Sequence, residues 1–115
     1  MAQSKREGAH MEQSYQSEQF VWRGITIEVR YCPDWSCAYR EVYGYPIAHL
    51  EIESVNPPKA QLPMTETGYR SHFIGAPVID DEGGPLAFVR AWLDKAADTP
   101  EWKSREAAAR QFSLF

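Results

Sequence analysis

The stretch QFVWRGITIEVRY, residues 19–31, decides the fold class of this chain. Its odd-numbered positions from Val21 onward are nearly all apolar, whereas Thr26, Glu28 and Arg30 occupy the even-numbered positions. Such alternation, with β-branched residues on the apolar side, is typical of a strand that buries one face. We therefore predict one extended segment over residues 20–31.

The stretch YPIAHLEIESV, residues 45–55, repeats this pattern. Its apolar positions are Ala48, Leu50 and Ile52, and its polar positions are His49, Glu51 and Glu53. Asn56 and the two prolines after it end the segment. We predict that the two segments pair as antiparallel strands. The expected core residues are Ile25, Ile27, Val29, Leu50 and Ile52.

Shorter elements follow. Residues 61–65 and 68–74 are predicted to be two extended pieces, with Gly68 supplying a turn of positive φ. Residues 80–85, DDEGGP, are predicted to be a loop, and Pro85 suits the first position of a helix. In that helix the apolar positions recur at helical spacing. They are Leu86, Val89, Trp92 or Leu93, and Ala96.

A second helix is predicted after Thr99, a good N-cap, and Pro100. Its apolar content is limited to Trp102 and alanines, so it resembles a semi-rigid spacer. The predicted architecture is α+β: a two-layer domain with an antiparallel sheet of about four strands and C-terminal helices. We assign residues 1–18 to a flexible tail, 19–110 to this single domain and 111–115 to a partner-binding tail. Residues 8–11, GAHM, look like a cloning junction.

The composition limits the classes of function. A chain of 115 residues with 43% hydrophobic and 24% charged residues suits one globular domain. A net charge of −4 argues against direct nucleic-acid binding and is compatible with a basic protein partner. The absence of an apolar run of membrane-spanning length or of a signal-peptide pattern predicts a cytoplasmic location without membrane contact.

Candidate metal ligands and catalytic groups are scattered. Cys32, Cys37, His49 and His72 are zinc-ligand types, but the cysteine spacing is poor and the histidines are isolated, so we predict no metal and no other cofactor. Whether the two cysteines are bonded stays open. Paired carboxylates beside a histidine can act as general acid and base, so a small enzyme is an alternative. Its residues would be His49, Glu51, Arg70 and His72. A solvated face with cross-strand charge pairs is the favoured interpretation.

A long connection, CPDWSCAYREVYGY at residues 32–45, carries Trp35, Tyr39, Tyr43 and Tyr45. With one arginine and no lysine it suits a protein contact, or packing on the domain, better than base stacking.

The stretch TETGYRSHF, residues 65–73, is similar to a segment of short uncharacterised bacterial proteins, some encoded on mobile DNA. WRGITIEVRY and GGPLAFVRAWLD share this resemblance. It implies a fold and a setting but no reaction. A candidate secondary site comprises Trp35, Tyr39, Thr65, Thr67, Arg70 and His72. The alternative is a turn stabilised by threonine hydroxyl groups, with Arg70 on the surface.

The chain ends in QFSLF, which resembles the motif by which bacterial replication and repair proteins bind the DNA sliding clamp, usually Gln-Leu-Ser/Asp-Leu-Phe. Gln111, Ser113, Leu114 and Phe115 match, and Phe112 departs from the usual leucine. The resemblance implies that Leu114 and Phe115 enter an apolar pocket of the clamp while Gln111 hydrogen-bonds at its rim. The alternative is that the apolar tail residues fold back on the sheet.

These observations predict a non-enzymatic interaction protein that docks on the bacterial sliding clamp. The alternative is a mobile-element counter-defence protein or inhibitor that acts through the acidic sheet face or the aromatic loop.

Overall fold

The structure is a computed structural model, and it describes residues 14–112. Its elements are β1 (Gln16–Trp22), β2 (Ile25–Cys32), α2 (Cys37–Tyr43), β3 (Ile47–Asn56), β4 (Tyr69–Gly75), α3 (Ala76–Asp81), α4 (Pro85–Ala97) and α5 (Pro100–Phe112). The strands form one antiparallel sheet in the order β1-β2-β3-β4. This confirms the predicted α+β class.

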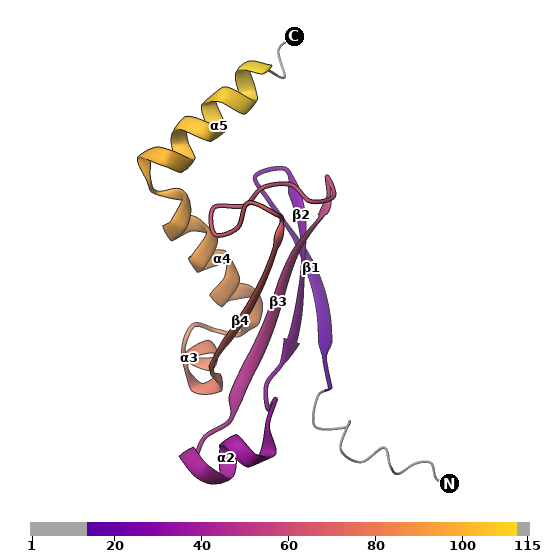
Figure 1. Cartoon of the computed structure of the whole chain (residues 1–115), viewed down its shortest axis with the longest axis vertical. Coiled ribbons are helices and arrows are strands. Elements are labelled where there is room, and N and C mark those ends of the chain that lie inside the picture. Colours follow the sequence, from indigo (N-terminus) through magenta and orange to yellow (C-terminus); the bar gives the residue numbers. More distant parts are fainter. Residues whose placement is uncertain (1–13, 113–115) are drawn as a thin grey trace, which may run out of the picture.

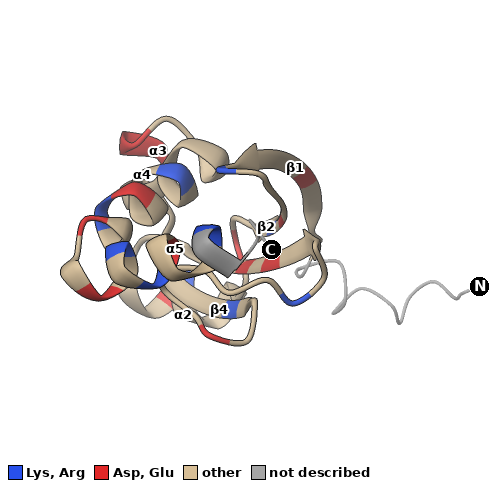
Figure 2. Cartoon of the chain, turned by 90° about the horizontal axis from the view of Figure 1, so that it is seen from above, with Lys and Arg blue, Asp and Glu red and all other residues tan. Residues whose placement is uncertain are grey.

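The two layers are a sheet and a set of helices on one of its faces. In Figure 1, α3 and α4 cover one side of the sheet, α2 lies at its lower end and α5 extends beyond its upper end. Figure 2 looks along the molecule from the α5 end and shows α3 and α4 together on one side of the sheet. No helix in residues 14–112 is long and apolar enough to cross a membrane.

The predicted single strand over residues 20–31 is wrong, because the segment folds as a hairpin. Arg23 and Gly24 have φ values of 49° and 83° and form a two-residue turn between β1 and β2. Trp22 pairs with Ile25 across this turn, and paired residues share a face of the sheet. The buried residues are therefore even-numbered before the turn and odd-numbered after it. Val21, an odd-numbered residue that the alternation predicted to be buried, is 62% exposed.

Residues 16–18, which the sequence analysis assigned to the tail, belong to β1. Gln16 pairs with Tyr31, and Glu18 pairs with Val29. Residues 16–18 are polar and show no alternation with apolar residues, because this end of the edge strand does not lie over the core. Phe20 is the first buried residue of the strand.

The core lies between the sheet and the helices. The pairing of β2 with β3 is antiparallel, as predicted, with Val29 opposite Ile52. Four of the five predicted core residues are buried, and Ile25 is half-buried at the edge of the core. Burial of each large aliphatic side chain contributes about 1.5–3 kcal/mol. On α4 the buried residues are Val89, Leu93 and Ala97, so Trp92 and Ala96 lie to the side of the core.

Three local elements differ from the sequence prediction. The connection after β2 contains α2, whose N-terminus is capped by the Ser36 hydroxyl oxygen accepting from the Tyr39 N–H at 3.1 Å. Helix α3 includes Asp80 and Asp81, so the predicted DDEGGP loop is wrong in its first two residues. Residues 61–65 form a bridge between Leu62 and Thr65 rather than a strand. The turn at Gly68 is confirmed, with a φ of 80°.

Candidate partner-binding surfaces

The last helix, α5, is attached to the domain at its first turn. Its N-cap is Thr99, as predicted, and the Thr99 hydroxyl oxygen accepts from the Trp102 N–H at 3.2 Å. Trp102 is 8% exposed and packs beside Trp22. From residue 103 to 110 the side chains are exposed, except for half-buried Glu106.

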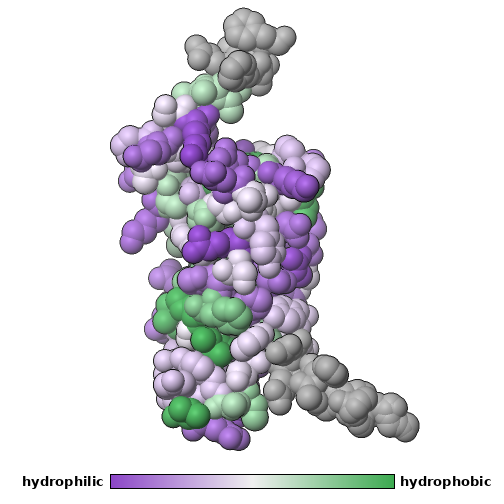
Figure 3. All heavy atoms as spheres, viewed as in Figure 1, coloured by the Kyte–Doolittle hydropathy of each residue, from purple (hydrophilic) through white to green (hydrophobic). Residues whose placement is uncertain are grey.

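Two ion pairs join the middle of α5 to the domain, and the longer one is Arg105 with Glu66 at 3.4 Å. Arg23, in the hairpin turn, donates from Nη1 to both carboxylate oxygens of Glu106 at 2.9 Å. The exposure of the side chains from residue 103 to 110 agrees with the spacer-like composition of α5. Figure 3 shows mainly hydrophilic residues around the base of this helix. Of the predicted partner-binding residues, Ser113, Leu114 and Phe115 lie outside the described residues, as do the side chains of Gln111 and Phe112.

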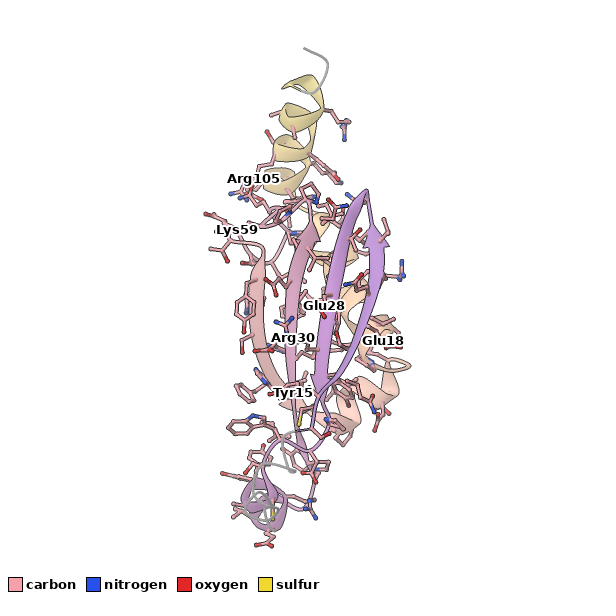
Figure 4. All side chains as sticks on the ribbon, turned by 90° about the vertical axis from the view of Figure 1, so that its right-hand side faces the viewer. Tyr15, Glu18, Glu28, Arg30, Lys59 and Arg105 are labelled. Carbon is pink, nitrogen blue, oxygen red and sulfur yellow. The ribbon has the colours of Figure 1, made fainter. Side chains whose placement is uncertain are left out.

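The open face is the side of the sheet that α3 and α4 leave uncovered, and Figure 4 shows it. At its centre, Arg30 binds three glutamates: Nε lies 2.8 Å from Glu51, Nη1 3.1 Å from Glu28 and Nη2 3.2 Å from Glu53. Three carboxylates around one guanidinium leave the centre of the face with an excess of two negative charges. The hydrogen bond from Arg30 lowers the pKa of Glu51. The favoured interpretation, a face with cross-strand charge pairs, agrees with this arrangement.

His49 lies on the same face, but it is packed and only 8% exposed. Its imidazole nitrogens are hydrogen-bonded to the hydroxyl groups of Tyr15 and Ser71. The ring stacks on Phe73 at 4.2 Å between centroids, with planes inclined by 13°. Burial lowers the pKa of His49 and favours its neutral form. Because both of its ring nitrogens are hydrogen-bonded, His49 has a structural role at this end of the sheet.

Tyr15 is a member of this end that the sequence analysis missed. It lies just before β1 and was assigned to the tail because its neighbours are polar. A lone tyrosine between serine and glutamine gives no periodic signal, so only the tertiary structure reveals its contact with His49.

The aromatic end is the cluster that α2 and its flanks form at the lower tip of the molecule, comprising Trp35, Tyr39, Val42, Tyr43 and Tyr45. Tyr39 packs on Tyr43 at 4.4 Å, and its hydroxyl group lies 3.3 Å from that of Tyr45. No α2 residue is buried, and Val42 and Tyr43 are 73% and 60% exposed. Figure 3 shows apolar residues gathered over α3 and at this tip. The connection therefore presents aromatic side chains to solvent.

The remaining residues of the secondary site fall into two pairs, Thr65 with Thr67 in a turn and Arg70 with His72 beside Trp92. The hydroxyl groups of Thr65 and Thr67 donate to the Tyr69 carbonyl at 2.8 and 3.3 Å, which is the threonine-stabilised turn of the alternative. Arg70 donates to the Met64 carbonyl at 3.1 Å and is 5.3 Å from the Trp92 ring.

The residues of the enzyme alternative are divided between the two faces of the sheet. His72 packs against Trp92 of α4 at 4.7 Å, so it lies on the helix side with Arg70. His49 and Glu51 lie on the open face, because alternate residues of a strand point to opposite faces. The sheet separates the two pairs, and they cannot act on one substrate.

No disulfide joins the two cysteines; Cys32 is buried and Cys37 is half-buried. Within residues 14–112, no group of three or more histidine, cysteine, aspartate or glutamate side chains is arranged to hold a metal ion.

The fold and surfaces define a small two-layer domain with one uncovered, acidic sheet face and a projecting terminal helix. The chain belongs to the KlcB third-domain family, whose model matches residues 15–102. No curated protein and no solved structure matches the chain. The matched region contains all four strands and ends at Trp102, so the exposed part of α5 and the tail lie outside it.

Proposed function

We propose that this chain is a non-enzymatic interaction protein of mobile DNA that docks on the bacterial DNA sliding clamp through residues 111–115. The observation that carries the proposal is the departure of α5 from the domain after Trp102. The helix is exposed from residue 103 to 110 apart from Glu106. We expect a motif that follows such a helix to reach a groove on another protein.

The motif supplies few contacts, and they are large apolar ones. Leu114 and Phe115 each contribute about 1.5–3 kcal/mol on full burial, and ordering of the tail offsets part of this. A few buried anchors commonly dominate a small interface. Because Phe112 replaces the usual leucine of the motif, we expect a dissociation constant on the order of micromolar.

The test is a titration of the full chain with a purified bacterial sliding clamp. Leu114→Ala with Phe115→Ala should abolish binding, and Phe112→Leu should tighten it because it restores the usual motif. Lys103→Ala changes an exposed residue of the same helix and is the matched control, with unchanged affinity. Failure of the intact chain to bind the clamp would refute the proposal.

The open face supports a second candidate function, that of a counter-defence protein or inhibitor. Its centre carries three carboxylates and one guanidinium, and such a face is complementary to a basic protein surface. Capture from a bacterial lysate tests it. If the open face binds a partner, the double variant Glu28→Gln, Glu53→Gln should no longer capture it, whereas the chain lacking Leu114 and Phe115 should still capture it. If removal of Leu114 and Phe115 abolishes the capture of every partner, this candidate is excluded.

A further inference from the structure

One edge of the sheet has none of the usual protection against pairing with another chain. β4 is an outermost strand, and its residues YRSHFIG pair with β3 in one continuous register. Edge strands commonly carry a proline, a lysine or a bulge that prevents further pairing, and β4 has none of the three. Its one arginine, Arg70, is turned onto the Met64 carbonyl and the Trp92 ring. Figure 4 shows β4 at the side of the open face, and no strand of residues 14–112 lies beyond it.

The backbone groups that point away from β3 belong to the odd-numbered residues of β4. The Tyr69 carbonyl accepts from the Thr65 and Thr67 hydroxyl groups at 2.8 and 3.3 Å, and the Tyr69 N–H donates to the Thr67 hydroxyl oxygen at 3.4 Å. In an antiparallel pair, residues that turn both backbone groups inward alternate with residues that turn both outward. Ser71 and Phe73 therefore turn their N–H and C=O groups outward, where no backbone group of residues 14–112 pairs with them.

Apolar side chains flank this edge on both faces of the sheet. Tyr69 and Phe73, on the open face, are 42% and 45% exposed. On the helix side, the edge borders a hollow lined by His72, Glu82, Phe88, Ala91, Trp92 and Lys95. A strand that pairs with β4 therefore covers apolar surface on both faces.

The charges along the edge favour a second copy of this chain as the occupant. Arg70 lies over Trp92, and Lys95 follows one turn later on α4, so this end of the edge is basic. Glu82 follows α3 and lies toward the other end of β4. A two-fold axis reverses the strand direction, so the basic end of each copy faces the acidic end of the other.

We propose that two copies of this chain pair through β4 around a two-fold axis at His72, so that their sheets join into one. Ser71 then lies opposite the partner's Phe73, and Phe73 lies opposite the partner's Ser71. Each of these two pairs exchanges two backbone hydrogen bonds. Tyr69 needs no partner, because the two threonines already satisfy its backbone groups.

This contact goes beyond the proposed clamp docking and uses no residue of the tail. The α5 helix extends beyond one end of the sheet (Figure 1). Because the two-fold axis reverses the strands, the two α5 helices project from opposite ends of the joined sheet.

Sedimentation equilibrium of the full chain tests the pairing. The edge is short, so we expect a dissociation constant on the order of 100 µM and a mass that approaches twice that of one chain near about 1 mM. Ser71→Pro removes the outward N–H and leaves the side that faces β3 unchanged. It should raise the dissociation constant about tenfold or more, since a hydrogen bond is lost at each of two symmetric positions. Ser71→Ala is the matched control, because it loses the same hydroxyl group but keeps the N–H, and its dissociation constant should be unchanged.

A cysteine at the axis tests the register independently. Directly opposed residues of a non-hydrogen-bonded pair have Cα atoms about 4.5 Å apart, which suits a disulfide. In a Cys37→Ser background, where Cys32 is buried, His72→Cys should form a disulfide-linked dimer on mild oxidation. Arg70→Cys in the same background should not, because its two Cα atoms lie about 14 Å apart in this register. A non-reducing gel measures both.

Three outcomes overturn the proposal. The first is the mass of one chain at every concentration up to about 1 mM, which leaves the edge to a strand of another protein. The second is equal association of Ser71→Pro and Ser71→Ala when circular dichroism shows both to be folded. The third is a dimer in which His72→Cys forms no more disulfide than Arg70→Cys, which places the contact elsewhere on the chain. If Ser71→Pro does not fold, the cysteine variants alone decide.

Discussion

The ring of Trp102 lies 6.2 Å from the ring of Trp22, centroid to centroid, with the planes inclined by 42°. This contact joins the last residue of β1 to the first turn of α5, and both side chains are buried. Trp102 is the point at which the projecting helix is fixed to the sheet. It is also the last residue of the family match.

Replacing this anchor should destabilise the whole domain. We expect Trp102→Ala to lower the free energy of unfolding by about 3–5 kcal/mol, because a large buried ring is removed. Lys103→Ala, its exposed neighbour, should change it by less than about 0.5 kcal/mol. Urea denaturation followed by circular dichroism measures both. Equal unfolding midpoints for the two variants would show that Trp102 does not anchor α5.

Removing Leu114 and Phe115 should leave the domain intact. If the tail serves a partner, the melting temperature of the truncated chain should match that of the full chain. If these residues instead fold back as core, their loss should cost about 2–5 kcal/mol each. Differential scanning calorimetry of the two chains decides between these outcomes, and a large drop in melting temperature contradicts the clamp proposal.

Gly68 should tolerate substitution much less well than Gly44. Both have positive φ, 80° and 81°, which costs an alanine about 1–2 kcal/mol. At Gly68 a Cβ atom would also lie 2.8 Å from the backbone of Lys59, whereas at Gly44 it meets nothing within 4 Å. The melting temperature of Gly68→Ala should therefore be well below that of Gly44→Ala. Similar melting temperatures would show that the segment around Lys59 yields without cost.

The cluster around Arg30 should give stability that depends on pH. Arg30 lowers the folded-state pKa of Glu51 below 4.5, so the stabilisation is fully present above about pH 4.5 and is lost as pH falls through the folded pKa. Arg30→Met should cost about 1–2 kcal/mol at neutral pH, and the difference from the unmodified chain should shrink in acid. Urea titrations across this pH range measure it.

Arg40→Met is the matched control for that prediction. Arg40 pairs with Asp34 at 3.1 Å, but its side chain is 48% exposed. Loss of such an exposed pair should cost less than about 1 kcal/mol. A cost as large as that of Arg30→Met would mean that the Arg30 cluster has no special role.

His49 should titrate below its ordinary range. Burial lowers its pKa from 6.5, and burial does the same for His72. A depressed histidine pKa contributes stability that is present above about pH 6.5 and is lost as pH falls through the folded pKa. NMR titration of the two imidazoles should give midpoints below 6.5. In the His49→Phe variant the loss of stability as pH falls below about 6.5 should be smaller, and the loss that remains should be the one due to His72. A midpoint above 6.5 for His49 would contradict its packed environment.

Much of the sheet and α4 could be predicted because their signals are local. The alternation through Val29 and through Leu50 gives two strands, and the helical spacing from Leu86 to Val89 gives α4. The hairpin was missed because the turn residues Arg23 and Gly24 continue an unbroken alternation in the sequence. The buried positions switch from even-numbered to odd-numbered residues at this turn only because the chain reverses its direction.

The surfaces were less predictable. The aromatic content of the connection after β2 was visible, but α2 was not, since a seven-residue helix with no buried residue lacks an apolar stripe. The pairing of Arg30 with Glu51 followed from strand register. The contacts of His49 with Tyr15 and Phe73 did not, because the sequence does not show which end of the sheet the preceding segment returns to.

The amino-acid sequence by itself determined the alternation of β2 and β3, helix α4, the Thr99 cap of α5 and the acidic side of β2 and β3, because each depends on residues a few positions apart. The tertiary structure alone decided which face of the sheet the helices cover, and so placed Arg70 and His72 on the opposite side from His49 and Glu51. It also brought Trp22 beside Trp102. Contacts between residues so distant along the chain arise from packing of whole elements, which no local pattern records.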